Sequence, residues 1–191
     1  MTLTAVLFAG GLSPRMGVDK ATHTIAGEQL WARQLRVLNG LQPDAFWISA
    51  RTMPAWCPPE IKTVLDEPPS RGPMSGLRAA LQSMRTSHLL TLAVDLPQMS
   101  TIHLLKLKSL ARPGCGVVRR NGDFLEVLCA IYPVEAAVIA ESTLVGTDAS
   151  LQNFARLLMQ HGCAQTCPLD ETEKPLYHNV NTPADMKKTT C

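Results

Sequence analysis

Short apolar runs along this chain alternate with segments in which apolar residues recur at helical spacing. The runs are rich in Val, Ile and Leu and have the length of buried strands. They cover residues 3–8, 45–50, 62–65, 89–94, 115–118 and 127–132. We therefore predict a strand over each of these ranges.

Helices are predicted in several of the intervening segments. Apolar side chains at positions i, i+3, i+4 and i+7 lie on one face of a helix. One such set is Leu77, Ala80, Leu81 and Met84, and a second is Leu151, Phe154, Ala155 and Leu158. Residues 28–39 and 100–111 are predicted helices with less regular faces. A last helix is predicted from Thr182, a cap hydroxyl followed by Pro183 in the first turn.

Alternation of strands and helices favours an α/β fold with a mostly parallel sheet covered on both faces. In such three-layer, Rossmann-like sheets, ligands bind outside the carboxyl ends of the strands, where the strand order reverses. The chain has 191 residues and no Gly/Ser-rich or Pro-rich linker between two halves. We therefore expect a single domain over residues 1–191.

The charge balance excludes some classes of partner. The formal net charge is +2 and no long basic run occurs, which argues against a broad nucleic-acid surface. No stretch has the length of a membrane span, and the N-terminal apolar run is short and has no leading positive charge. We therefore expect a cytoplasmic protein that binds neither nucleic acid nor membrane.

The six cysteines show no pairing of Cys-x-x-Cys type that would indicate zinc.

The segment that follows the first predicted strand carries the strongest chemical signal. Residues 8–20 read Phe-Ala-Gly-Gly-Leu-Ser-Pro-Arg-Met-Gly-Val-Asp-Lys. Gly10 and Gly11 permit backbone angles that turn successive N–H groups towards an anion, and Arg15 and Lys20 add two cations. The spacing fits neither the P-loop nor the dinucleotide fingerprint. On these features alone, a phosphate-binding loop and a surface turn with incidental charges are both open.

Asp95 ends another apolar run, and Pro97 prevents the strand from continuing. A carboxylate at this position can cap the next helix, but Ser100 and Thr101 are better placed for that. Mg²⁺ needs only one or two carboxylates in addition to waters and phosphate oxygens. The pattern therefore favours Asp95 as a metal ligand.

Two further sites combine polar residues with turn signals. Asp66 ends a short apolar run, and Gly72-Pro-x-x-Gly76 opens a predicted helix whose N-terminal N–H groups suit an anion. An ordinary tight turn is the alternative. Near the C-terminus, Asn179 and Asn181 project from the same side of an extended segment and offer uncharged donors and acceptors. A turn with a helix cap explains that segment equally well.

The string Gly-Gly-x-Ser-x-Arg-Met-Gly-x-Asp-Lys resembles the signature of the MobA-like nucleotidyltransferases. The segments around Asp66 and Gly72, around Asp95, and around Asn179 follow in the family's order, so the resemblance runs from residue 7 to residue 185. It implies one α/β nucleotidyltransferase domain that uses Mg²⁺.

The resemblance also implies roles for individual residues, which fall into four groups. The base and sugar of the nucleotide rest on the loop that begins at Phe8, Ala9, Gly10 and Gly11. Arg15 and Lys20 neutralise the triphosphate, and Asp95 holds Mg²⁺. Asp66 contacts the nucleotide, and Gly72 and Gly76 shape its pocket. Asn179 and Asn181 belong to the acceptor side, and Glu126 precedes a strand that faces the acceptor.

The implied activity is transfer of GMP from GTP to the molybdenum-bound molybdopterin cofactor, with release of pyrophosphate and formation of the guanine dinucleotide. The alternatives are a cytidylyl or sugar-phosphate nucleotidyltransferase on the same fold, and a non-catalytic chaperone. A transient molybdoenzyme or cofactor-delivery partner would fit either the enzyme or the chaperone. The chain departs from the family's pattern at Leu12 and Pro14 and over residues 119–132. There, Arg119 and Arg120 are either charges for an acceptor phosphate or exposed residues of a hairpin at Asn121-Gly122.

Overall fold

The computed structural model describes residues 1–10, 19–181 and 185. Within these residues the chain forms a seven-stranded mixed sheet and a small two-stranded hairpin, β2 (Thr24–Ile25) with β3 (Glu28–Gln29). The order of the large sheet is β5 (Lys62–Leu65), β4 (Ala45–Ala50), β1 (Leu3–Phe8), β6 (His88–Ala93), β8 (Phe124–Pro133), β7 (Gly116–Asn121) and β9 (Ala164–Pro168). All of these strands run in one direction except β8, which is antiparallel to both β6 and β7.

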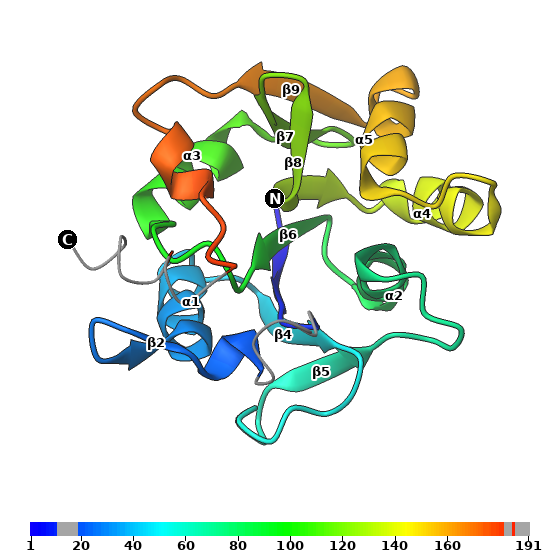
Figure 1. Ribbon diagram of the computed structural model, residues 1–191. Coiled ribbons are helices and arrows are strands. Elements are labelled where there is room, and N and C mark those ends of the chain that lie inside the picture. Colours follow the sequence, from blue (N-terminus) through cyan, green and yellow to red (C-terminus); the bar gives the residue numbers. More distant parts are fainter. Residues whose placement is uncertain (11–18, 182–184, 186–191) are drawn as a thin grey trace.

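Helices cover both faces of the sheet and make it the middle layer of three (Figure 1). On one face lie α1 (Leu30–Asn39) and α3 (Thr101–Leu110). On the other lie α2 (Pro73–Ser83), α4 (Ala136–Val145) and α5 (Leu151–Gln160). The two faces bury separate apolar clusters because side chains of each strand alternate between them. Leu7 of β1 belongs to the first cluster and Val6 to the second. The predicted α/β fold with a mostly parallel sheet is confirmed.

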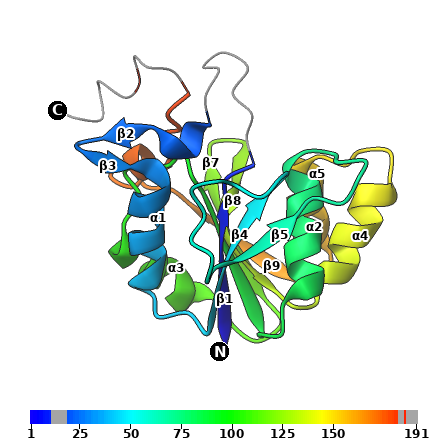
Figure 2. The same ribbon diagram turned by 90° about the horizontal axis from the view of Figure 1, so that it is seen from below.

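The order of the strands produces a cleft at one edge of the sheet. From β1 the chain proceeds outward to β4 and β5, then returns to place β6 on the other side of β1. The segments after β1 and β6 therefore leave the sheet side by side, as open α/β sheets require at a reversal of strand order. Figure 2 shows β1 running from the N-terminus towards the end of the molecule near which the described part of the C-terminal region also lies.

Most predicted elements are confirmed, with small shifts at their ends. The range 28–39 is divided into β3 and α1, and the strand predicted over 127–132 extends from Phe124 to Pro133. The hairpin at Asn121-Gly122 is confirmed by the pairing of Asn121 with Phe124, and Gly122 takes a positive φ of 60°. The predicted start of a C-terminal helix at 182–184 lies outside the described residues.

Among the α-helices and the strands of the large sheet, α4 and β9 had no clear signal in the sequence. Helix α4 is apolar on nearly every side, and it leaves Val138 and Val145 exposed, so its pattern has no polar stripe. Strand β9 is a polar edge strand whose side chains are mostly half-buried, so neither alternation nor an apolar run marks it. Across the residues described, none of the helices is long and apolar enough to cross a membrane.

Candidate active site

Three polar side chains from distant parts of the chain meet in the cleft. The ammonium Nζ of Lys20 lies 3.1 Å from Oδ2 of Asp95 and donates a hydrogen bond of 2.6 Å to Oδ1 of Asn181. The side chains of Lys20 and Asp95 are only 15% and 19% exposed, so water screens the pair incompletely. All three residues were predicted site residues, and the fold brings them together.

Lys20 is placed by a short helical turn, η1 (Lys20–Thr22), that packs into the core through Ala21. Asp19 caps this turn: its Oδ1 accepts a 3.0 Å hydrogen bond from the N–H of Ala21. Its Oδ2 accepts a 2.7 Å hydrogen bond from the indole of Trp56, whose ring stacks on Trp31 with centroids 5.3 Å apart. One aspartate therefore fixes the backbone on which Lys20 stands.

Asp95 lies just beyond the end of β6, in a turn that the neighbouring helix holds. Side chains of α1 donate to two carbonyls of this turn. The buried amide of Gln34 bonds the carbonyl of Leu96, and Arg33 bonds that of Pro97. The carbonyl of Asp95 itself accepts a 2.9 Å hydrogen bond from the N–H of Val180. The carboxylate thus stands on backbone that is fixed from two sides.

A cavity of about 430 Å³ opens beside this pair, and we call it the Lys20 cavity. Its lining includes six residues predicted for nucleotide binding, namely Phe8, Gly10, Lys20, Asp66, Gly72 and Asp95. Ala9 is buried next to it, and its N–H donates to the carbonyl of Ser49 at 2.9 Å. Gly11 and Arg15, also predicted for this site, lie outside the described residues.

The Gly-Pro turn brings α2 close to the floor of the Lys20 cavity. Gly72 has a φ of +70°, which favours glycine, and Pro73 then starts the helix. A Cβ on Gly76 would lie 2.4 Å from Oγ of Ser49 and 3.0 Å from Oδ1 of Asp66. Gly76 is therefore the residue that lets this helix approach the ends of two strands.

Asp66 is held in place by the same turn. Its Oδ2 accepts a 2.7 Å hydrogen bond from the hydroxyl of Ser70, which in turn accepts one of 3.2 Å from the N–H of Gly72. Its backbone N–H donates to the carbonyl of Ala50 at 3.2 Å. The loop that carries the Gly-Pro motif and the carboxylate at the end of β5 thus form one unit.

A second cavity of about 400 Å³ adjoins the first, and we call it the Asn179 cavity. The two cavities share four lining residues, Pro73, Ala93, Asp95 and Leu128. Asn179 lines only the second, together with Glu126 and the half-exposed ring of Phe124. Burial raises the pKa of Glu126, although a hydrogen bond from Asn121 opposes the shift. Asp95 therefore stands at the boundary of two adjoining hollows.

Neither interpretation of Arg119 was right. Its side chain is buried on the α3 face of β7 and pairs with Glu173, so it is neither an exposed hairpin residue nor a charge in the cleft. Arg120, one position further along the strand, is exposed, as the hairpin alternative predicted. The tip of the hairpin points outward, while the alternation of the strand turns Arg119 inward.

Ser49 and Arg51 also line the Lys20 cavity, although neither was predicted from the sequence. Both stand at the carboxyl end of β4, the predicted strand beside the first. Since parallel strands end at the same edge of a sheet, that position was the available signal. Among the described residues, no group of three or more His, Cys, Asp or Glu side chains is arranged to hold a metal ion.

Comparison with known proteins identifies the family to which this chain is similar. Residues 5–164 match the family model described as the MobA-like NTP transferase domain. A probable molybdenum cofactor guanylyltransferase of Opitutus terrae is 34% identical, over 97% of this chain and 94% of the relative. The molybdenum cofactor guanylyltransferase of Pseudomonas fluorescens SBW25 is 30% identical, over 94% of this chain and 90% of the relative.

Solved structures share the fold. The molybdopterin-guanine dinucleotide biosynthesis protein A of Archaeoglobus fulgidus superposes with a TM-score of 0.73 at 20% identity, covering 98% of this chain and 96% of that one. A nucleotidyl transferase from Methanothermobacter superposes with a TM-score of 0.76 at 13% identity, covering 99% and 96%. With the family model spanning most of the chain, this protein belongs to the MobA-like NTP transferase family.

Proposed function

We propose that this chain transfers GMP from GTP to the phosphate of the molybdopterin cofactor and releases pyrophosphate. The observation that carries the proposal is the Lys20–Asp95–Asn181 constellation at the boundary of two adjoining cavities. A transferase of this kind must hold two substrates so that their phosphates meet at one point. The relatives named as molybdenum cofactor guanylyltransferases support the choice of substrates.

In this proposal GTP occupies the Lys20 cavity. Its base and ribose lie against the wall made by Phe8, Gly10 and Gly72, and Asp66 contacts the nucleoside. Lys20 offers a positive charge to the triphosphate, and Arg15 would add a second. Such fixed charges stabilise the charge that spreads over the transferred group in the transition state.

The acceptor occupies the Asn179 cavity with its phosphate towards Asp95. Asn179 offers an amide donor and acceptor there without adding charge, while the amide of Asn181 accepts the hydrogen bond from Lys20 beside it. An oxygen of the acceptor phosphate forms a bond to the α-phosphorus while the bond from that phosphorus to the bridging oxygen of pyrophosphate breaks. Because the second pKa of a phosphate monoester is about 6, the nucleophile is already ionised at neutral pH and needs no catalytic base.

Mg²⁺ fits the donor set at this place. Asp95 supplies a carboxylate to the cleft. Among the described residues no three His, Cys, Asp or Glu side chains are grouped so that they could bind a metal ion by themselves. An ion bound through one carboxylate takes its other ligands from water and phosphate oxygens, as Mg²⁺ commonly does. We therefore propose Asp95 as the protein ligand of Mg²⁺, which when bound would neutralise charge on the phosphates.

The fold alone does not select the base. A 4-diphosphocytidyl-2C-methyl-D-erythritol synthase from Anaerococcus prevotii superposes with a TM-score of 0.72 at 11% identity, covering 99% of this chain and 94% of that one. The guanylyl proposal therefore needs a direct test. Pyrophosphate release is measured with the molybdenum cofactor, Mg²⁺ and each of GTP, CTP, ATP and UTP, with acceptor-free reactions as the control.

We expect release that depends on the acceptor and a preference for GTP of at least about tenfold in kcat/KM, which corresponds to about 1.4 kcal/mol. A tenfold preference for CTP or UTP would contradict the guanylyl assignment. Binding of GTP without any pyrophosphate release in the presence of acceptor would instead favour the chaperone alternative.

A further inference from the structure

The polar cluster around Glu173 has no part in the proposed chemistry, yet it lies on the segment that carries Asn179 and Asn181. This segment, residues 169–181, leaves β9, passes through the short helix η2 (Lys174–Tyr177) and ends at the cleft; we call it the strap. Its first residue is fixed by a hydrogen bond from the N–H of Leu169 to the carbonyl of Arg120.

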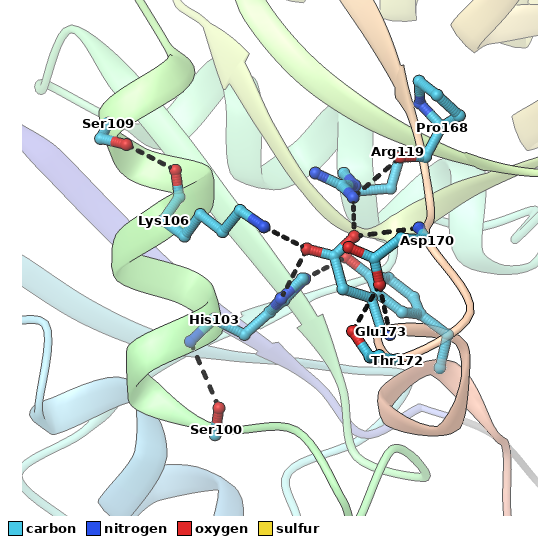
Figure 3. A network of polar contacts seen from close by, with 10 residues as sticks. Ser100, His103, Lys106, Ser109, Arg119, Pro168, Asp170, Thr172 and Glu173 are labelled. Carbon is cyan, nitrogen blue, oxygen red and sulfur yellow. Dashed lines mark hydrogen bonds and ion pairs between the residues drawn. The ribbon is translucent and has the colours of Figure 1, made fainter.

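Glu173 attaches the strap to two elements of the fold. From α3, Lys106 donates a 2.6 Å hydrogen bond to its Oε1, and from β7, the guanidinium of Arg119 contacts its Oε2 (Figure 3). Both Glu173 and Arg119 are buried, while Lys106 reaches in from the surface. Arg119 also donates a 2.9 Å hydrogen bond to the carbonyl of Pro168, at the end of β9.

These contacts favour the ionised form of the Glu173 carboxyl group. Burial alone would raise its pKa, but the hydrogen bond from Lys106, the N–H of Asp170 and the charge of Arg119 together keep the pKa below its usual value. Asp170 in turn accepts a 2.9 Å hydrogen bond from the N–H of Glu173, which closes the turn of the strap. Removing the charge of this buried carboxylate would destabilise the fold, because it would leave the buried guanidinium of Arg119 without a negative partner.

The strap has two further attachments before it reaches the cleft. The hydroxyl of Tyr177 shares a 2.9 Å hydrogen bond with Nε2 of His103 on α3. Val180 is buried and donates its N–H to the carbonyl of Asp95. These contacts place Asn179 in the wall of its cavity and Asn181 against Lys20.

We propose that Glu173 and Arg119 are positioning residues for the acceptor: their buried pair fixes the strap so that Asn179 and Asn181 face the cleft. The inference rests on the proposed function, because it assigns the Asn179 cavity to the acceptor. In this arrangement GTP lies mainly against residues at the ends of β1, β4 and β6 and at the start of α2, none of which contacts Glu173 or Arg119. On the nucleotide side the strap contacts only Lys20, through Asn181, and the backbone of Asp95, through Val180, among the contacts described above. We therefore expect loss of the pair to weaken acceptor binding more than GTP binding.

The test compares Glu173→Gln with Glu171→Gln. Both replace a carboxylate by an amide on the same strap, but the side chain of Glu171 is 85% exposed and pairs with the neighbouring Lys174. We expect Glu173→Gln to raise KM for the molybdenum cofactor about tenfold and to change the Kd of GTP less than twofold. Glu171→Gln leaves both values as in the wild type.

Hydrogen exchange supplies a readout independent of turnover. In Glu173→Gln the amide of Val180 exchanges at least about tenfold faster, while the amide of Leu7 in β1 keeps its wild-type rate. A purely structural role would accelerate both amides and weaken both substrates together, and that result would overturn the proposal. Unchanged acceptor KM and unchanged exchange at Val180 would overturn it as well.

If Glu173→Gln does not fold, Arg119→Lys carries the same test, because it keeps a positive charge beside Glu173 but removes the guanidinium that contacts both Glu173 and the carbonyl of Pro168. A rise of about threefold in acceptor KM with unaltered GTP binding is then expected, and no rise contradicts the inference. Absence of guanylyl transfer by the wild type would instead refute the proposed function. Normal wild-type transfer with kinetically silent variants would refute the positioning role alone.

Discussion

The ammonium of Lys20 and the carboxylate of Asp95 lie 3.1 Å apart, although 75 residues separate them in the chain. Each follows a strand of the parallel half of the sheet, and β1 and β6 are hydrogen-bonded neighbours. The pair therefore results directly from the reversal of strand order at β1. It places one positive and one negative group at the point where the proposed substrates meet.

Replacing Asp95 by Ala is expected to lower kcat for Mg²⁺-dependent pyrophosphate release about 10²-fold or more, since the proposed metal ligand is lost. The half-buried position of Asp95 predicts a folded variant, which circular dichroism and thermal melting would check. Activity close to that of the wild type would remove Asp95 as the metal ligand.

Replacing Lys20 by Ala is expected to raise KM for GTP about tenfold, equivalent to about 1.4 kcal/mol, because the triphosphate loses a fixed charge. Steady-state kinetics at saturating acceptor measure this effect. Lys174→Ala, which removes an exposed lysine of the strap paired with Glu171, is the matched control. Unchanged kinetics of Lys20→Ala would exclude a role for Lys20 in binding the triphosphate.

Gly76→Ala is expected to weaken GTP binding about tenfold, or about 1.4 kcal/mol, because the new methyl group meets Ser49 and Asp66. Titration calorimetry with GTP and Mg²⁺ measures the change. The double variant Ser49→Ala, Gly76→Ala removes the hydroxyl with the shortest contact and should recover most of the lost affinity. Equal losses in the single and double variants would show that the Ser49 contact is not the cause.

Stability is expected to fall as the pH is lowered from about 7.5 to about 5.5, in part through His103. Burial lowers the pKa of His103; the negative charge of Glu173 opposes this shift, and the positive charges of Arg119 and Lys106 add to it. His103 therefore binds a proton at a higher pH in the unfolded chain than in the folded protein. The stability that its neutral form provides is fully present above the pKa of His103 in the unfolded chain, and it is lost as the pH falls towards the lower pKa of the folded state. Urea unfolding at several pH values measures this loss.

His103→Gln serves as the comparison for the pH dependence. Its amide retains a polar partner for the hydroxyl of Tyr177 but does not titrate. The variant should lose less stability than the wild type over the same pH interval. Burial also lowers the pKa of His88, so a residual slope is expected. An identical slope in both proteins would contradict the assignment to His103.

Much of the fold and of the candidate site follows from local sequence signals. The strands are continuous apolar runs because both faces of a parallel sheet are buried, and functional residues cluster where those runs end. Asp66 and Asp95 could be found in this way. The hairpin at Asn121-Gly122 was equally clear because few dipeptides tolerate positive φ.

Other features depend on tertiary contacts that no local pattern encodes. Arg119 appears as a surface charge in the sequence, and its burial depends on its partners Glu173, 54 residues away, and the carbonyl of Pro168. Strand β9 is recognisable only through its partner β7. The burial of Arg119 and the formation of β9 thus depend on residues that are distant in the sequence and adjacent in the fold.

The wall shared by the Lys20 cavity and the Asn179 cavity has a consequence for turnover. Under the proposed function pyrophosphate leaves and the GMP part of the nucleotide is joined to the acceptor, so the product keeps the contacts of the nucleoside in one cavity and those of the acceptor in the other. Such a product dissociates more slowly than either half because both ends must detach together. Product inhibition should therefore be competitive towards the nucleotide and towards the acceptor alike, and release of the finished dinucleotide becomes the step at which a receiving protein could act.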